Sequence, residues 1–257
     1  EVGADVVPVG CPPKGRKINA GCGATRPDLL QLTVTGVRAH AGLALDGDGD
    51  RVVMVDESGE LIDGDRLLYI LARDRLEQGV LRGPVVGTVM SNLGLELALG
   101  ELGIEFRRAR VGDRHVLEML KASGGVLGGE TSGHVLCLDK ATTGDGLVTA
   151  LQVLAVMRRT SASLRELVAD MPVYPQRIVN VDAADGVDVN DEPGIQDAVG
   201  EAESVLGERG RVVLRASGTE PVIRVMVEGE DEETVTTVAH RLAESVRSRV
   251  DSKAAGS

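Results

Sequence analysis

Short apolar runs and amphipathic segments alternate along most of this chain, which favours an α/β fold with mixed or largely parallel sheets. Apolar runs at residues 6–9, 42–45 and 52–55 predict buried strands. A helix is predicted over residues 65–78, because leucine and isoleucine recur there at helical spacing and Gly79 follows the last turn.

A second group of elements follows residues 81–84, where glycine and proline indicate a break. Strand and helix patterns alternate there, as they do in the parallel sheets of α/β domains. The predicted strands cover residues 85–89 and 104–109, and the predicted helices cover residues 93–102, 114–122 and 145–158.

The order of elements changes after residues 171–176, where two prolines indicate a linker. The remaining pattern predicts a small α+β domain with a final helix whose valines and leucines give one apolar face. Its predicted elements are strands at 177–181, 211–214 and 222–227 and a helix near 195–206. We therefore expect three domains and a polar tail, at residues 1–80, 81–171, 172–251 and 252–257.

The composition is that of a globular protein of two or three domains, with 257 residues of which 42% are hydrophobic and 26% are charged. A net charge of −12 argues against a nucleic-acid partner, and an aromatic content of 1% removes the side chains on which single strands stack. An acidic protein that binds anionic substrates needs arginines concentrated at one place.

The three cysteines, Cys11, Cys22 and Cys137, form no closely spaced pair, which favours a reducing cytoplasm and predicts neither disulfides nor a zinc site. No apolar run approaches the roughly 18 residues that cross a bilayer, and no secretory pattern is present, so we expect no membrane partner. The chain begins without methionine and leads at once into an apolar run, so it is expected to start inside a larger protein.

Residues 46–51 have the sequence DGDGDR directly after a predicted strand. Carboxylates are hard oxygen ligands, and the intervening glycines allow the backbone to curl until all three face one cation. The pattern predicts an Mg²⁺ site with Arg51 as an adjacent positive charge and with the ligands Asp46, Asp48 and Asp50. An ordinary acidic turn between strands is the alternative, and the pattern alone does not decide between them.

A calcium-binding EF-hand is a further alternative, because Asp46, Asp48, Asp50 and Glu57 have its ligand spacing. The sixth loop position, where an EF-hand needs glycine, is Arg51. The flanking runs also predict strands instead of helices. The sequence therefore excludes an EF-hand and leaves a strand–turn–strand site.

The sequence RASGTEP at residues 215–221, with an arginine three residues later, lies between two predicted strands. Guanidinium groups donate paired hydrogen bonds to phosphate oxygens, and serine, threonine and glycine add hydroxyl and backbone donors. The predicted phosphate ligands are Arg215, Ser217, Gly218, Thr219 and Arg224. A hairpin turn with surface arginines is the simpler alternative, but such a turn does not need so many donors.

A third polar loop, GGETSGH at residues 128–134, lies between two apolar runs. Glu130 can accept hydrogen bonds from two adjacent hydroxyls, and Ser132 can donate and accept, which suits a polyol ligand. The spacing alone does not distinguish such a site from a structural turn. His134 is interpreted first as a structural histidine and only second as a catalytic one.

Together and in this order, the three loops resemble the α-D-phosphohexomutase superfamily, and in particular its bacterial members that act on glucosamine phosphate. The resemblance extends over nearly the whole chain. It rests on GLALDGDGDRVVMVDESGELIDGDRLLY at 42–69, VGTVMSNLGLELAL at 86–99, VGDR at 111–114, GETSGH at 129–134, TGDG at 143–146 and RASGTEPVIRVMVEG at 215–229.

This resemblance implies an isomerase-class phosphotransferase that interconverts glucosamine 6-phosphate and glucosamine 1-phosphate through a phosphoserine and a bisphosphate intermediate. It also implies Mg²⁺ beneath the phosphoserine. The implied roles are metal binding for Asp46, Asp48 and Asp50, an active-site charge for Arg51, sugar binding for Glu130 and Ser132, and binding of the phosphate that is not transferred for Arg215, Ser217, Gly218, Thr219 and Arg224.

The chain departs from the superfamily pattern at Thr131, Ala216 and His115, where Asn or Gln, Pro or Lys, and Tyr are usual. A Ser-His-Asn-Pro-like phosphoserine segment is absent, so the chain is expected to be the C-terminal part of such an enzyme and to need the missing part for activity. A phosphomannomutase or phosphoglucomutase is the close alternative, and a non-catalytic module that binds metal or sugar phosphate is the alternative from another class. The proton acceptor and the oligomeric state, a homodimer included, stay open.

Overall fold

The computed structural model describes residues 3–11, 15–182, 192–217 and 221–254, with side chains described up to residue 250. The chain forms two compact units. The N-terminal unit comprises residues 1–91 and 95–172, and the C-terminal unit comprises residues 92–94 and 173–257. This division falls in the predicted linker, whereas the domain boundary expected after residue 80 stays a prediction.

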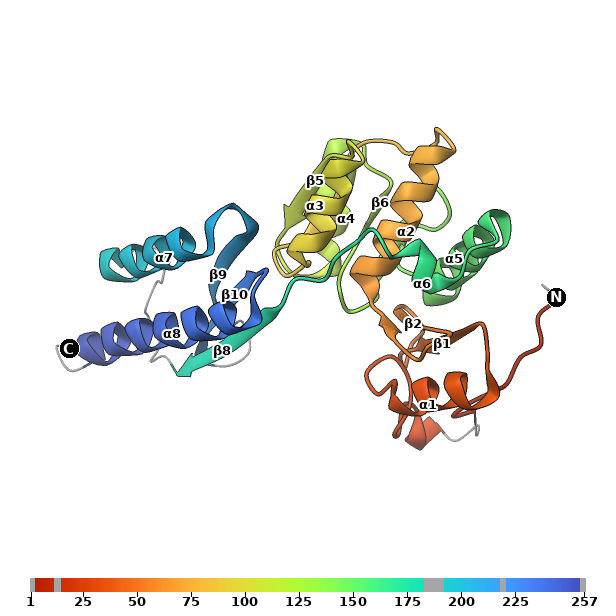
Figure 1. Ribbon diagram of the computed structural model, residues 1–257, viewed down its shortest axis with the longest axis horizontal. Helices are drawn as coiled ribbons and strands as arrows, with labels where there is room; N and C mark the ends of the chain where they lie inside the picture. The colour runs from red at the N-terminus through yellow and green to blue at the C-terminus, as the bar shows by residue number, and fades with distance from the viewer. Residues whose placement is uncertain (1–2, 12–14, 183–191, 218–220, 255–257) are drawn as a thin grey trace. The chain divides into compact units, whose positions relative to one another are not determined.

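The N-terminal unit begins with a small antiparallel sheet of order β1-β2-β3 (Figure 1). β1 and β2 form a hairpin in which Leu45 pairs with Val52, and the loop between them carries the acidic motif. The elements are the short 3₁₀ helix η1 (Gly15–Lys17), α1 (Asp28–Val37), β1 (Ala41–Leu45), β2 (Val52–Asp56) and β3 (Leu61–Ile62).

The expected strand at residues 6–9 is wrong. These residues form no strand, and Val6 and Val7 are 78% and 56% exposed. A strand needs a partner for its backbone hydrogen bonds, and an apolar run of four residues does not specify one.

The second sheet of this unit has the order β5-β4-β6-β7. β4 is parallel to β5 and to β6, and β7 returns antiparallel to β6. Parallel pairing, expected for most of the chain, occurs among the described residues only in this sheet. The elements are α2 (Gly64–Glu77), β4 (Val85–Thr88), α3 (Leu93–Glu101), β5 (Phe106–Ala109), α4 (Asp113–Ser123), β6 (Leu127–Gly129), β7 (Val135–Cys137), α5 (Gly146–Thr160) and α6 (Leu164–Leu167).

Helices cover both faces of this second sheet. Successive residues of a strand point to opposite faces, so Val85 packs with the core formed by α2, α3 and α5, while Val86 packs with Val116 and Leu120 of α4. The fold of this part is therefore a three-layer α/β/α arrangement. The loops at the carboxyl ends of β4, β5 and β6 emerge at one edge of the sheet, which is where ligands bind in such folds.

The C-terminal unit is an antiparallel sheet of order β8-β10-β9 with two helices packed on one face. Ile223, Val225 and Val227 of β10 point into this core, together with Val235 and Leu242 of the last helix. The predicted α+β character is confirmed. The elements are β8 (Gln176–Asp182), α7 (Pro193–Leu206), the 3₁₀ helix η2 (Gly207–Arg209), β9 (Gly210–Ala216), β10 (Val222–Gly229) and α8 (Glu232–Ala254).

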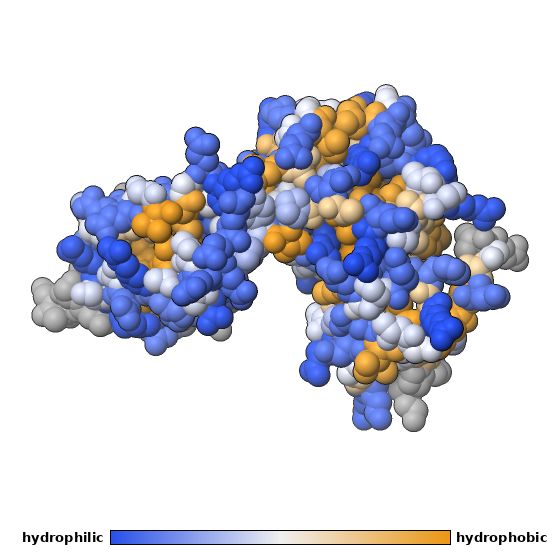
Figure 2. Space-filling model, in the orientation of Figure 1, coloured by the Kyte–Doolittle hydropathy of each residue, from blue (hydrophilic) through white to orange (hydrophobic). Residues whose placement is uncertain are grey.

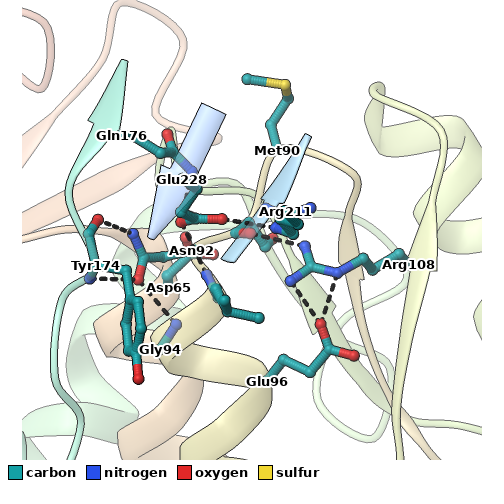
Figure 3. A network of polar contacts seen from close by, with 12 residues as sticks. Asp65, Met90, Asn92, Gly94, Glu96, Arg108, Tyr174, Gln176, Arg211 and Glu228 are labelled. Atoms are coloured by element: carbon teal, nitrogen blue, oxygen red, sulfur yellow. Dashed lines mark hydrogen bonds and ion pairs between the residues drawn. The ribbon is translucent and has the colours of Figure 1, made fainter. Parts of the chain in front are cut away.

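A polar cluster lies on the opposite face of the same sheet, around the fully buried Glu228 (Figure 3). Its carboxylate accepts hydrogen bonds from Nε of Arg211 at 2.6 Å, Nε2 of Gln176 at 2.9 Å and the backbone N–H of Leu93 at 2.9 Å. Asn92 accepts from the N–H of Tyr174 at 3.0 Å and donates to its carbonyl at 3.0 Å. These bonds explain why residues 92–94 belong to the C-terminal unit.

Polar side chains dominate the face of the molecule in Figure 2, and apolar residues form separate patches between them. Within the described residues, the structure contains no helix with the length and hydrophobicity required to span a bilayer.

Candidate functional site

The acidic loop between β1 and β2, residues 46–51, forms a tight turn closed by its own first side chain. Oδ1 of Asp46 accepts hydrogen bonds from the backbone N–H groups of Gly49 at 3.1 Å and Arg51 at 3.2 Å. Gly49 has φ +78°, a conformation that favours glycine. As a result, one carboxylate oxygen from each of Asp46, Asp48 and Asp50 lies within 4.8 Å of the others.

Two of these carboxylates have opposite pKa shifts. Partial burial raises the pKa of Asp46, but a hydrogen bond with Asp50, the amides of Arg51 and Gly49 and the charge of Arg51 outweigh it, so this pKa lies below its ordinary value. Burial and the neighbouring Asp46 raise the pKa of Asp50, and His134 offsets this only in part. The loop therefore concentrates negative charge that a dication would neutralise.

The donor set fits Mg²⁺. Three converging carboxylates are hard oxygen ligands, and a rigid turn with one exposed member, Asp48, leaves room for water or phosphate oxygens in an octahedral shell. Arg51 lies beside the carboxylates, with Nε 3.7 Å from Oδ2 of Asp46 and 3.8 Å from Oδ1 of Asp50. Its side chain is 44% exposed, so the guanidinium remains accessible to a ligand.

His134 contacts this loop from a distant part of the sequence. Its Nδ1 lies 3.0 Å from Oδ2 of Asp50, and the residue is 4% exposed. The imidazole lies against Gly144, where a Cβ would be 2.4 Å from Nε2. A glycine in the TGDG motif is therefore required for the ring to occupy this place, and His134 orients one of the three carboxylates.

Glycines also bring the loop at residues 128–134 against the acidic loop. The N–H of Val52 donates to the carbonyl of Gly133 at 3.1 Å, and a Cβ on Gly133 would lie 2.1 Å from the carbonyl of Val52. Gly146, at the start of α5, donates to the carbonyl of Gly49 at 2.9 Å. The two loops and the beginning of α5 therefore form one connected assembly in the N-terminal unit.

Within this assembly Glu130 and Ser132 differ in environment. Oε1 of Glu130 accepts a hydrogen bond from the N–H of Gly112 at 2.9 Å, so its carboxylate points toward the VGDR loop that follows β5. Ser132 is exposed. The loop that carries both predicted sugar contacts thus packs against the hairpin that carries the predicted metal ligands, although the two are about 80 residues apart in the sequence.

The predicted phosphate ligands belong to the C-terminal unit. Arg215 of β9 pairs in register with Arg224 of β10, so their side chains project from the same face of the sheet. Burial, and then the charge of Arg224, lowers the pKa of Arg215. The N–H of Ser217 donates to the carbonyl of Val222 at 2.8 Å. Gly218 and Thr219 lie outside the described residues.

Sequence reasoning missed two contributors to the site. His134 is buried and hydrogen-bonded, as the structural interpretation expects, but the sequence did not indicate its contact with a predicted metal ligand. No sequence pattern singles out Asp65, at the start of α2, but Oγ1 of Thr131 in the sugar loop donates to it at 2.8 Å. The repeated DGD at 63–65 and the TGDG glycine are the available signals, but Asp65 lies 66 residues from Thr131 and His134 lies 84 residues from Asp50 in the sequence.

The comparison with known families matches most of the chain that carries these loops. The family descriptions "Phosphoglucomutase/phosphomannomutase, alpha/beta/alpha domain III" and "Phosphoglucomutase/phosphomannomutase, C-terminal domain" match residues 63–174 and 178–245. The chain belongs to the phosphoglucomutase/phosphomannomutase family. The resemblance to the α-D-phosphohexomutases is thereby confirmed.

Curated members of the phosphoglucomutase/phosphomannomutase family are similar over nearly the whole chain. The phosphoglucosamine mutase of Alkalilimnicola ehrlichii is 56% identical over 247 residues, which are 96% of this chain and 55% of that protein. The phosphoglucosamine mutase of Escherichia coli O7:K1 is 55% identical over 248 residues, which are 96% of this chain and 56% of that protein. The chain therefore spans little more than half the length of these relatives.

Solved structures of this family share the fold. N-acetylphosphoglucosamine mutase of Aspergillus fumigatus, in complex with GlcNAc-6P and magnesium, superposes with a TM-score of 0.72 at 23% identity, covering 89% of this chain and 53% of that one. A family member from Burkholderia thailandensis superposes with a TM-score of 0.71 at 22% identity, covering 88% and 50%. At these identities the likeness concerns the fold alone.

Proposed function

We propose that the protein containing this chain is a phosphoglucosamine mutase, which interconverts glucosamine 6-phosphate and glucosamine 1-phosphate. The observation that carries this proposal is the 55–56% identity to curated phosphoglucosamine mutases over 96% of the chain. The activity is assigned to the whole protein, because the chain spans 55–56% of those relatives.

In this proposal Asp46, Asp48 and Asp50 hold Mg²⁺, which when bound neutralises negative charge on the transferring phosphoryl group. Arg51 supplies a further positive charge beside that group. The serine that carries the phosphoryl group lies in the part of the protein outside these residues. This chain then contributes positioning and charge neutralisation, which account for most of the catalysis in phosphoryl transfer.

Glu130 and Ser132 bind the sugar in this proposal. One oxygen of Glu130 accepts from Gly112, and its other oxygen can accept from sugar hydroxyls. The negative charge of Glu130 also attracts a protonated amino group, which supports an amino sugar over a neutral hexose. The exposed Ser132 hydroxyl can donate to and accept from the ring substituents.

Arg215 and Arg224 bind the phosphate that is not transferred, together with Ser217, Gly218 and Thr219. Like charges opposite each other on neighbouring strands destabilise a sheet, so an arginine pair at this register favours an anion between the two guanidiniums. Burial, and then the charge of Arg224, lowers the pKa of Arg215, and a bound phosphate would stabilise the charged form of this guanidinium.

The test is an assay of the whole protein with Mg²⁺ and a trace of hexosamine bisphosphate. We expect kcat/KM for glucosamine 6-phosphate to exceed that for mannose 6-phosphate and glucose 6-phosphate by on the order of tenfold or more. Asp48→Asn should abolish turnover, whereas Asp170→Asn, an exposed carboxylate paired with Arg73, should not. Preference for a neutral hexose phosphate would refute the substrate assignment, and binding without turnover would favour a binding module.

A further inference from the structure

The first turn of α2 supports the sugar loop directly. The N–H of Gly64 donates to the carbonyl of Thr131 at 3.0 Å. A Cβ on Gly64 would lie 2.0 Å from the carbonyl of Glu130, so only glycine allows this approach. The loop therefore rests on the helix through backbone contacts that a side chain would prevent.

The next residue, Asp65, holds the same loop through its side chain. It is 1% exposed, and its Oδ2 accepts a hydrogen bond from Oγ1 of Thr131 at 2.8 Å. Burying a carboxylate is costly unless its oxygens are hydrogen-bonded. Thr131 stands between Glu130 and Ser132, so fixing it at both its carbonyl and its hydroxyl also fixes the directions of its two neighbours.

Asp65 is not needed to begin the helix. The residue at the N-cap is Asp63, whose side chain accepts from the N–H of Arg66 at 3.0 Å and so supplies the usual cap. The buried carboxylate of Asp65 instead faces a loop that lies 66 residues away in the sequence. A capping role therefore does not explain it, whereas a role in holding the sugar loop does.

We propose that Asp65 is a positioning residue for sugar recognition, which acts through Thr131 to orient Glu130 and Ser132. This inference rests on the proposed function, because it concerns the same sugar loop. It predicts that any residue at position 131 able to donate to Asp65 preserves the site. Threonine, serine and asparagine qualify, and valine does not.

The first arm of the test measures amide hydrogen exchange in this chain without any ligand. In Asp65→Ala, the amides of Glu130 and Gly133 should exchange about tenfold faster, because the loop loses one of its anchors. The matched control is Asp74→Ala, which removes a buried carboxylate at the other end of α2 that contacts Gln78 and Arg159. Equal acceleration at residues 130–133 in both variants would overturn the proposal, because it would indicate general loosening of the helix.

The second arm measures binding to the whole protein by calorimetry. Asp65→Ala and Thr131→Val should each weaken the binding of glucosamine 6-phosphate about tenfold. The double variant should bind no more weakly than Asp65→Ala alone, because that variant already lacks the bond that Thr131→Val removes. Thr131→Ser and Thr131→Asn should bind as the wild type does, and the affinity for inorganic phosphate should not change.

Unchanged glucosamine 6-phosphate affinity in Asp65→Ala would overturn the proposal, as would an equal loss in Asp74→Ala. If the unaltered protein failed to bind glucosamine 6-phosphate, the proposed function would fail. The exchange arm would still decide whether Asp65 positions the loop.

Discussion

The contact between His134 and Asp50 illustrates what single residues contribute to the candidate metal site. An imidazole that donates to a carboxylate ligand restricts the rotation of that carboxylate and raises the affinity of the site for metal. The ring is 4% exposed, and Gly144 provides the space that it occupies. The contact between His134 and Asp50 could not be assigned from the sequence, because the two residues are 84 positions apart.

Replacing His134 tests this orienting role. We expect His134→Ala to weaken Mg²⁺ binding by about 10-fold to 100-fold, because Asp50 loses the partner that fixes one of its oxygens. Calorimetric titration of this chain with Mg²⁺ provides the measurement. The control is His240→Ala on the exposed side of α8. An unchanged Mg²⁺ affinity in His134→Ala would refute the role.

At the scale of elements, glycines determine how closely the loops and strands of the site approach one another. The sugar loop touches β2 through Gly133, and α2 touches the sugar loop through Gly64. Both contacts are backbone to backbone. They hold the loops rigidly without using side chains that the ligand needs.

Gly133→Ala is predicted to destabilise the N-terminal unit by about 2–5 kcal/mol. This loss combines the cost of a positive φ at alanine with the cost of the steric overlap between its Cβ and Val52. Gly124→Ala is the matched control, because Gly124 also has a positive φ of 70° but has no atom within 4 Å of its virtual Cβ. That variant should lose only about 1–2 kcal/mol. Urea unfolding measures both variants. Equal losses of unfolding free energy in Gly133→Ala and Gly124→Ala would show that the contact between the sugar loop and β2 does not contribute to stability.

A second element-scale prediction concerns Glu228, which joins β8, β9 and β10 on the face without helices. Glu228→Ala should destabilise the C-terminal unit by about 3–5 kcal/mol, because it removes the carboxylate of a buried ion pair with Arg211, whose side chain is 16% exposed, together with two further hydrogen bonds.

The control for Glu228 is Glu201→Ala, which breaks an ion pair with Arg241 whose side chains are 68% and 72% exposed. It should change stability by less than about 1 kcal/mol. Thermal unfolding of the unaltered chain, Glu228→Ala and Glu201→Ala measures the two losses of stability. A loss in Glu228→Ala no larger than that in Glu201→Ala would contradict the role of the buried cluster.

Periodicity predicted most elements because long helices and buried strands repeat their apolar positions. For this reason the predicted bounds of α2 and α5 are close to the observed ones, and the final helix predicted without bounds is α8. α1 (Asp28–Val37) was missed, since its β-branched residues and a glycine do not favour a helix. Residues 6–9 were misassigned because strand pairing depends on residues far away in the sequence.

The acidic triad could be predicted as a cluster because all its members lie in one turn, and the structure brings them within 4.8 Å. The union of this turn with the sugar loop could not be predicted from local pattern. It depends on close backbone approaches at Gly133 and Gly146 that no local pattern encodes. Only the resemblance to a family placed the two loops in one site.

At the scale of the whole molecule, the two units have separate hydrophobic cores. The cores of the N-terminal unit draw on residues between 52 and 171, and the core of the C-terminal unit draws on residues between 181 and 250. The metal and sugar loops belong to the first unit and the arginine pair to the second. The first unit alone therefore contains both loops of the central claim, which is that the metal loop and the sugar loop form one site.

A crystal of this chain soaked with Mn²⁺, an anomalous scatterer that prefers the same oxygen ligands as Mg²⁺, and with glucosamine 6-phosphate gives the most direct test. The account predicts an anomalous peak about 2.1 Å from oxygens of Asp46, Asp48 and Asp50, with sugar density in contact with Glu130 and Ser132. A peak elsewhere, or a sugar bound away from residues 130–132, would contradict it.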